Sequence, residues 1–363
     1  MAPPLIHVVG GASVALRVNG LARPVIAGPG AGWHSSGMTS FLTPPTASVG
    51  HAHAEGGRRA RGFADALLAA FAAASLLLAV PAGAQTPPVP ETRFLALGEG
   101  RIAYDDTGGP GPLVLAIPGM GDLRSEYRAL RPLLVQAGWR VVTMDVRGHG
   151  ESSAPWSDYS AHAVGRDALA LIAHLNAGPA VILGNSFAAG SALWAAHDAP
   201  ARVRAAVLLG PIVRDGPPSW LAKAAVTVGF AGPWRVRFWM TYWNSLFPTR
   251  KPADHAEAKA ALARNLREPG RMAALRTMVG LSKADTEAML PASRVPALVV
   301  MGTRDPDFPD PEVEARWLAA QLRADSLLVE GAGHYSHLEM PELVVPRLLS
   351  FLAGLPAGPA APR

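Results

Sequence analysis

A serine that follows a short apolar run is the residue in this chain best placed to act as a nucleophile. Residues 180–183 are entirely apolar, and Gly184-Asn185-Ser186 follows them, ahead of a run of small residues. This pattern is typical of a strand that turns sharply into a helix and holds a serine at the turn. Because a free hydroxyl is a weak nucleophile, Ser186 needs a base within hydrogen-bond reach.

Two further polar residues come directly after predicted strands. Asp305 follows the apolar run 297–301, and His334 follows the run 326–329. Functional groups gather at the carboxyl ends of the strands in a parallel sheet, so we expect these side chains to meet Ser186 there. In that arrangement Ser186 attacks a carbonyl carbon, His334 transfers the proton, and Asp305 fixes the tautomer of the imidazole.

Other residues compete for the roles of acid and base. Asp307 and Asp310 lie close to Asp305, and we interpret them as solvated or helix-capping residues. His337 lies three residues beyond His334 and is the alternative base, although it is also consistent with a place on the turn that follows. Asp305 is preferred over Asp307 and Asp310 because of its position in the loop after the strand.

An oxyanion that forms on the attacked carbonyl needs two hydrogen-bond donors. The loop 117–121 follows an apolar run, and its backbone amide at Met120 is our first choice. The amide of Phe187, directly after the serine, is the second. Asp122 and Glu126 follow the same loop, and we expect them to lie in solvent.

The rest of the chain alternates strand and helix patterns. Apolar runs that predict strands are followed by helical patterns, as at 125–137, 161–175 and 341–353, and Asp167 is expected on a polar helix face. This predicts an α/β fold, with a mostly parallel, doubly wound sheet flanked by helices. Residues 212–290 break the alternation, and 253–266 and 270–279 within them have helical patterns. We predict a core formed by 93–211 and 291–354, with 212–290 inserted as a helical cap.

Five motifs in this order resemble those of the α/β-hydrolase fold superfamily, in particular serine hydrolases of the esterase or lipase type. They are Pro118-Gly119-Met120-Gly121, the Asp-x-x-Gly-x-Gly-x-Ser segment 145–152, Gly184 to Ala188, Gly302 to Asp305, and Gly333-His334. The resemblance covers about 92–354. It implies hydrolysis of esters, or less often of amides, lactones or carbon–carbon bonds. The chain departs from the family pattern at Pro118, where a histidine is common, and at Ala188, where the second glycine of the elbow is usual.

The N-terminal region has the pattern of an export signal. Arginines at 58, 59 and 61 precede an apolar stretch at 66–80, and Pro81-Ala82-Gly83-Ala84 fits a signal-peptidase site. We therefore expect a signal peptide at 58–84, a linker at 85–92 and a periplasmic or secreted protein, with an uncleaved N-terminal anchor as the alternative. Residues 1–57 are expected to be a disordered or wrongly assigned extension, and 355–363 a disordered tail. Translation starting downstream, at Met38 for example, would explain the extension.

Composition narrows the classes of function. The chain has no cysteine, which excludes disulfides, thiolate metal sites and a cysteine nucleophile. Its net charge of +5 is modest and forms no basic stripe, so no nucleic-acid partner is expected. We expect neither metal nor cofactor, and the sequence carries no signal for a particular oligomeric state.

The predicted cap is rich in aromatic residues between 220 and 247. Packing accounts for part of them, and others are candidates to line an apolar acyl pocket or to contact a membrane surface. The expected substrate is a small apolar ester. The same three residues would also serve a cofactor-free perhydrolase or haloperoxidase-like activity, or an amidase. A non-catalytic α/β-hydrolase that binds a small ligand is the alternative of a different class.

Overall fold

A computed structural model describes residues 90–217 and 219–356. The predicted N-terminal extension at 1–57 and signal peptide at 58–84 lie outside these residues, as do most of the linker at 85–92 and of the tail at 355–363. Within the described part, no helix combines the length and the apolar character needed to cross a membrane.

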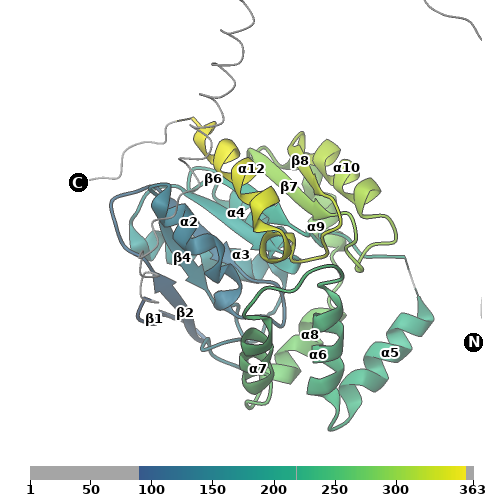
Figure 1. The fold of residues 1–363 in the computed structure, drawn as a ribbon. Coiled ribbons are helices and arrows are strands. Elements are labelled where there is room, and N and C mark those ends of the chain that lie inside the picture. The colour runs from purple at the N-terminus through teal and green to yellow at the C-terminus, as the bar shows by residue number, and fades with distance from the viewer. Residues whose placement is uncertain (1–89, 218, 357–363) are drawn as a thin grey trace, which may run out of the picture. The chain divides into compact units, whose positions relative to one another are not determined.

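An eight-stranded sheet forms the centre of the described chain (Figure 1). Its strand order is β1-β2-β4-β3-β5-β6-β7-β8, and only β1 with β2 and β2 with β4 pair antiparallel. The bounds are β1 (Arg93–Leu97), β2 (Gly100–Asp106), β3 (Leu113–Ile117), β4 (Arg140–Met144), β5 (Ala180–Asn185), β6 (Val203–Leu209), β7 (Ala297–Gly302) and β8 (Asp325–Val329). The predicted fold class is confirmed. Every residue of β3, β5 and β7 is buried, which explains why these strands appear in the sequence as continuous apolar runs.

Helices cover both faces of the sheet. One apolar cluster joins the sheet to α3 (Ala161–Leu175), α4 (Phe187–Asp198) and α10 (Pro311–Leu322). The cluster on the other face includes α2 (Leu130–Gln136) and α12 (Pro341–Ala353).

The predictions for two of these helices had different outcomes. The bounds of α3 are those that the sequence predicts, because Ser160 caps its first turn through the amide of Ala163. The single helix expected at 125–137 is instead a 3₁₀ helix, η1 (Arg124–Arg128), followed by α2. Pro132 has no N–H to donate to the carbonyl of Arg128, so one continuous α-helix cannot keep its hydrogen-bond ladder there.

Among the described residues between β6 and β7, the only regular elements are helices, and we call residues 220–292 the cap. They are α5 (Trp220–Ala231), α6 (Arg235–Ser245), α7 (His255–Asn265), α8 (Arg271–Gly280), α9 (Ala284–Met289) and the 3₁₀ helix η2 (Leu290–Ala292). The cap has an apolar cluster of its own, which includes Trp239, Trp243 and Leu275 and is completed by Tyr335 and Leu338 from the short helix α11 (Ser336–Glu339) and the loop before it. Figure 1 shows α6, α7 and α8 together below the sheet, with α5 at the outer side of the group.

The strand register explains which loops meet. Ile117 at the end of β3 pairs with Gly184 of β5, and Asn185 at the end of β5 pairs with Leu209 of β6. Gly302 at the end of β7 pairs with Val329 of β8. The loops that follow these strands therefore begin at the same edge of the sheet, and they carry the polar residues described next.

Candidate active site

Ser186 lies at the sharp turn between β5 and α4. Its backbone has φ 56° and ψ −123°, a conformation that non-glycine residues adopt only where the surroundings impose it. Two hydrogen bonds hold it there: the Ser186 amide donates to the Leu209 carbonyl at 2.8 Å, and the Ile212 amide donates to the Ser186 carbonyl at 3.1 Å. A side chain at Gly184 would collide with the backbone of Ala188, so the turn requires a glycine at that position.

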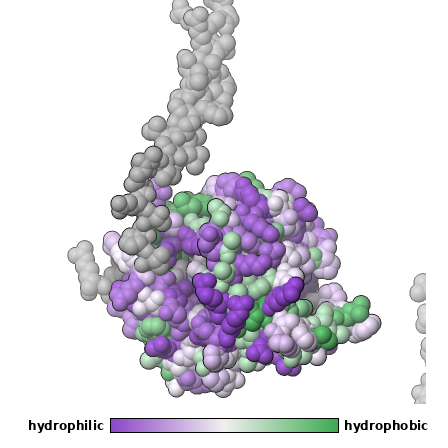
Figure 2. Space-filling model, turned by 60° about the horizontal axis from the view of Figure 1, so that its bottom comes forward, coloured by the Kyte–Doolittle hydropathy of each residue, from purple (hydrophilic) through white to green (hydrophobic). Residues whose placement is uncertain are grey.

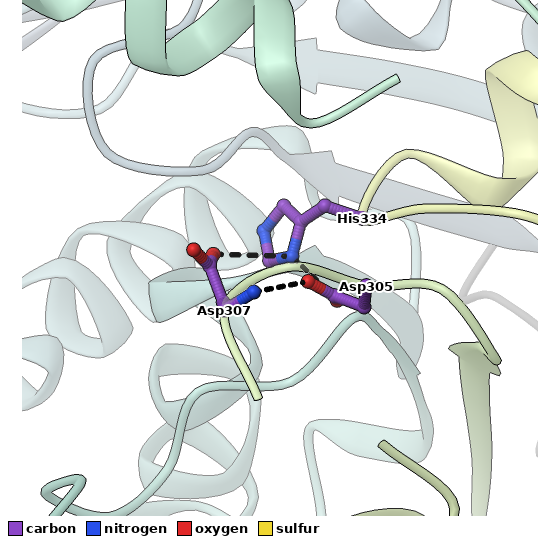
Figure 3. A group of neighbouring side chains, drawn as sticks. All are labelled: Asp305, Asp307 and His334. Atoms are coloured by element: carbon purple, nitrogen blue, oxygen red, sulfur yellow. Dashed lines mark hydrogen bonds and ion pairs between the residues drawn. The ribbon is translucent and has the colours of Figure 1, made fainter. Parts of the chain in front are cut away.

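His334 lies in the loop after β8 and is almost completely buried. Its Nδ1 is 2.7 Å from Oδ2 of Asp305, which lies in the loop after β7 (Figure 3). Gly210, directly after β6, packs against the ring, because a Cβ there would lie 3.1 Å from Nδ1. The His334 amide also donates to the carbonyl of Leu246, which ties this loop to the cap at 3.1 Å.

Asp307 is a second carboxylate at the same imidazole. Its Oδ2 lies 3.4 Å from Nδ1 of His334, and its amide donates to Oδ1 of Asp305 at 3.0 Å (Figure 3). Its other oxygen accepts a hydrogen bond from the hydroxyl of Tyr242 on α6 at 2.6 Å. The expectation that Asp307 is solvated is therefore wrong, because the cap covers it. Asp310 caps α10 through the amide of Val313, as expected.

The two carboxylates determine the charge of the imidazole. Burial by itself lowers the pKa of His334, but Asp305 and Asp307 together outweigh burial and raise this pKa to about 9. Burial also raises the pKa of Asp307 above its usual range. Asp305, Asp307 and His334 are also close enough to suggest a metal site, since their ligand atoms lie within 4.8 Å of one another. The hydrogen bond to Asp305 places a proton on Nδ1, and a protonated ring nitrogen cannot coordinate a metal.

Ser186 and His334 line the same cavity, which has a volume of about 410 Å³. The core also contributes Gly119, Met120 and Tyr335 to its wall, and Ile212 comes from the loop after β6. The remaining wall comes from the cap and is mainly apolar; its residues are Val226, Phe230, Phe238, Trp239, Tyr242, Leu246, Val279 and Lys283. The structure thus brings the predicted nucleophile and base to one apolar chamber, with Asp305 behind the base.

The two predicted oxyanion donors lie beside the serine. A Cβ on Gly119 would be only 3.2 Å from the Cβ of Ser186, so the loop after β3 runs directly past the nucleophile. Phe187 is the first residue of α4, where backbone amides have no acceptor within the helix. Within residues 90–217 and 219–356, neither the Met120 amide nor the Phe187 amide has a hydrogen-bond acceptor. Of the two residues, Met120 lines the cavity, and Phe187 directly follows Ser186.

A buried carboxylate supports this loop. Oε2 of Glu126 accepts a hydrogen bond from the Gly119 amide at 3.1 Å, and its Oε1 lies 3.2 Å from Nε2 of His337. Asp122 is buried as well and accepts a hydrogen bond from the indole of Trp243 at 3.0 Å. The expectation that Asp122 and Glu126 lie in solvent is wrong. Their burial depends on the cap and on α11, and no local sequence signal indicates it.

These groups occupy a low-dielectric environment. Burial, and then the nearby carboxyl of Asp122, raise the pKa of Glu126 well above its ordinary value. Burial lowers the pKa of His337 to about 3, so this ring is neutral. The ring of His337 stacks on Tyr127 and is absent from the cavity wall, so the structure does not place this alternative base beside Ser186.

Asp145 and Asp167 stabilise the fold around the turn at 145–152 and do not line the cavity. Asp145 accepts hydrogen bonds from the amides of Arg124 at 2.8 Å and Glu151 at 2.9 Å, so it braces the turn that it begins. Asp167, which we expected on a polar helix face, is buried and pairs with Arg147 at 2.6 Å. That partner comes from the same turn and is twenty residues distant in sequence, so helical periodicity alone could not indicate the pair.

Comparison with known proteins identifies the family of the chain. Residues 112–341 match the family described as "alpha/beta hydrolase fold", so the chain belongs to that family, as the motifs predicted. It is 25% identical over 213 residues to 3-oxoadipate enol-lactonase 2 of Acinetobacter baylyi, covering 56% of this chain and 74% of that one. It is 24% identical over 326 residues to epoxide hydrolase A of Mycobacterium tuberculosis, covering 73% and 98% respectively.

A solved structure of a hydrolase from Pseudomonas aeruginosa PA01 superposes with a TM-score of 0.63 at 25% identity. The superposition covers 73% of this chain and 99% of that one. These relatives are hydrolases, which supports hydrolase activity for this chain.

Proposed function

We propose that this protein is a serine hydrolase that cleaves carboxylic esters through an acyl-enzyme. The observation that carries the proposal is the shared cavity of Ser186 and His334, in which Nδ1 of the histidine is tied to Asp305 at 2.7 Å. This leaves Nε2 as the ring nitrogen that can accept a proton. A nucleophile, an oriented base and two unpaired backbone amides are the parts that acyl transfer requires.

The reaction follows from these positions. Oγ of Ser186 attacks the ester carbonyl while its proton passes to Nε2 of His334, and the amides of Met120 and Phe187 stabilise the oxyanion. The bond to the alkoxy group then breaks, and His334 returns the proton to the leaving alcohol. Water, deprotonated by His334, attacks the acyl-enzyme and releases the acid together with a free Ser186.

The substrate class follows from the cavity wall and the nucleophile. The cap supplies mainly apolar side chains, which favour an apolar acyl or alcohol group. Epoxide hydrolysis, the activity in the name of one relative, requires a nucleophilic carboxylate, and this chain has Ser186 at the turn. A lactone is a cyclic ester and would react by the same steps, and the name of the enol-lactonase relative favours testing lactones.

A fluorophosphonate probe tests the proposal directly, because it forms a covalent bond only with an activated serine. We expect the folded protein to be labelled and Ser186→Ala to remain unlabelled. Ser191→Ala is the matched control, since Ser191 is a completely buried serine on α4, and it should label normally. An unlabelled but folded wild-type protein would favour the ligand-binding alternative.

Purified protein should then be tested on esters, lactones and amides, and for peroxide-dependent halogenation. Ester or lactone turnover that disappears in Ser186→Ala supports the proposed activity. Turnover of amides alone, or of halide with peroxide alone, would assign the protein to one of the alternative reactions of the same three residues.

Export is the second part of the proposed function. The arginines at 58, 59 and 61, the apolar stretch 66–80 and the small residues around Ala82 and Ala84 support it. N-terminal sequencing of protein recovered outside the cytoplasm should give Gln85 as the first residue. A membrane-bound product that retains residues 58–84 would instead establish the N-terminal anchor.

A further inference from the structure

The outer side of α5 exposes large apolar side chains. Of the eight exposed large apolar residues in the described part of the chain, four lie within 220–234: Trp220 at 75%, Leu221 at 61%, Val228 at 61% and Trp234 at 51%. We call these four residues the α5 patch. In Figure 2 the lobe at the right, where α5 lies in Figure 1, carries hydrophobic residues on its surface. A concentration of this kind marks an interaction surface more often than chance exposure does.

The segment around the α5 patch carries positive charge only. Residues 216–253 contain no aspartate or glutamate, and they contain the basic residues Lys223, Arg235, Arg237, Arg250 and Lys251. The first three are exposed and have no ion-pair partner among the described residues. The apolar and aromatic α5 patch therefore lies in a segment of the chain that carries unpaired cations.

The opposite side of the same helix faces the cavity. Val226 and Phe230 of α5, together with Phe238 of α6, line the chamber that contains Ser186 and His334. One helix thus separates an exposed apolar surface from an apolar interior. A molecule bound at the α5 patch would lie one helix away from the reacting groups.

We propose that the α5 patch docks on the surface of an anionic lipid bilayer. Tryptophan favours the boundary between headgroups and acyl chains, and exposed lysine and arginine are attracted to anionic headgroups. Self-association through the same surface is disfavoured, because a symmetric contact would bring Lys223, Arg235 and Arg237 of two copies together. The proposal goes beyond the esterase activity and does not depend on it, since binding requires no catalysis.

The absence of cysteine allows a site-specific test. In the full chain, Val228→Cys carries an environment-sensitive fluorophore on α5, and Leu343→Cys carries it on α12 as the control at a comparable exposed apolar site, 47% exposed. Vesicles of phosphatidylcholine with phosphatidylglycerol should shift the emission at 228 to the blue and leave 343 unchanged. Because the readout is local, vesicle binding through residues 66–80 would not imitate it.

Two sets of substitutions identify the forces involved. Replacing Trp220 and Trp234 by serine in the labelled protein should weaken the vesicle response about tenfold. Lys223→Gln with Arg235→Gln and Arg237→Gln should weaken it by at least about tenfold and remove its salt dependence. Arg316→Gln on α10 should have no effect, and an added Ser186→Ala should leave the response unchanged.

Three outcomes would overturn the proposal. A label at 228 that does not respond to vesicles, in protein that hydrolyses a water-soluble ester, shows that the α5 patch does not bind lipid although the enzyme is active. A response at 228 to protein concentration without lipid assigns the surface to a second copy of the chain. If pure phosphatidylcholine vesicles give the same response as vesicles with phosphatidylglycerol, and the basic-residue variants do not change it, binding does not require an anionic lipid surface. In each case the activity of the same samples tests the proposed function separately.

Discussion

Around the cavity, the groups that the α/β core contributes differ in kind from those of the cap. The core contributes polar groups whose positions are fixed by hydrogen bonds, such as Ser186 at its turn and the Gly119 amide, which donates to Glu126. The cap contributes apolar side chains on helices, such as Val226 and Phe230. This division predicts that changes in the core alter the rate of the chemical step, whereas changes in the cap alter which substrate is accepted.

The largest expected effect tests the core. Asp305→Asn keeps the size of the side chain but removes the acceptor that fixes the tautomer of His334, so kcat should fall by about 10³- to 10⁴-fold. Asp310→Asn is the matched control, because Asp310 only caps α10 and its loss should cost about 1 kcal/mol of stability at most, with kcat unchanged. Steady-state kinetics and thermal unfolding measure the two effects. If Asp307→Asn abolishes activity while Asp305→Asn retains it, the roles of the two carboxylates are reversed.

The second prediction tests the support of the oxyanion loop. Glu126→Ala removes the acceptor of the Gly119 amide and leaves a buried cavity, so kcat should fall by about 10- to 100-fold with KM changed much less. Glu126→Gln keeps an oxygen for that amide, and because burial already favours the neutral carboxyl it should retain most of the activity. Equal losses in the two variants would mean that the charge of Glu126, not its hydrogen bond, supports the loop.

The third prediction concerns the cap. Val226→Trp fills space at the apolar wall that the cap contributes to the cavity. The kcat/KM for long-chain esters should therefore fall by about tenfold, while kcat/KM for acetate esters should change little. A series of p-nitrophenyl esters of increasing acyl length measures this. A uniform loss for all chain lengths would contradict the assignment of specificity to α5.

The smallest expected effect concerns Asp307, which contacts His334 of the core and Tyr242 of the cap. A base must be neutral to accept a proton, so kcat/KM should rise with pH as His334 loses its proton near pH 9. Asp307 helps to stabilise the charged imidazole, so Asp307→Asn should move this rise to lower pH by about half a pH unit. The substitution should therefore increase kcat/KM at neutral pH by a few-fold.

Tyr242→Phe tests whether the cap acts through Asp307. This variant removes the hydroxyl that binds Asp307 and leaves the ring in place. The pH dependence of kcat/KM should change in this variant. The loss of kcat expected for Asp305→Asn should not occur. A profile that is unchanged in both Asp307→Asn and Tyr242→Phe would show that Asp307 does not influence the base.

The core was more predictable from the sequence than the cap. Strands buried on both faces appear as uninterrupted apolar runs, and the helical pattern predicted the bounds of α3. In the cap, the helices α7 and α8 agree with the expected ranges within about two residues at each end, whereas α5 and α6 were not predicted separately. Their apolar and aromatic residues are divided among the cavity wall, the apolar cluster of the cap and the exposed surface, so composition did not indicate which of them are buried.

Buried charge was the least predictable feature. The local sequence around Asp122 and Glu126 is typical of an exposed loop. The local sequence around Asp307 is typical of a loop that precedes a helix. Their burial results from contacts with Trp243, His337 and Tyr242, which lie between 65 and 211 positions away in the sequence. A pattern within one segment cannot indicate such burial, because the residues that cover these carboxyl groups come from distant parts of the sequence.

The sequence by itself determined the strand and helix order, the membership of the α/β-hydrolase family, and Ser186, Asp305 and His334 as candidates, since each depends on a local pattern beside a strand end. Only the tertiary structure decided that two carboxylates face the imidazole of His334, that Glu126 holds the Gly119 amide, and that α5 has apolar residues on both its cavity side and its outer side. The physical reason is that hydrogen bonds, dielectric environment and exposure are properties of the space around a residue, which the folded chain fills with segments remote in sequence.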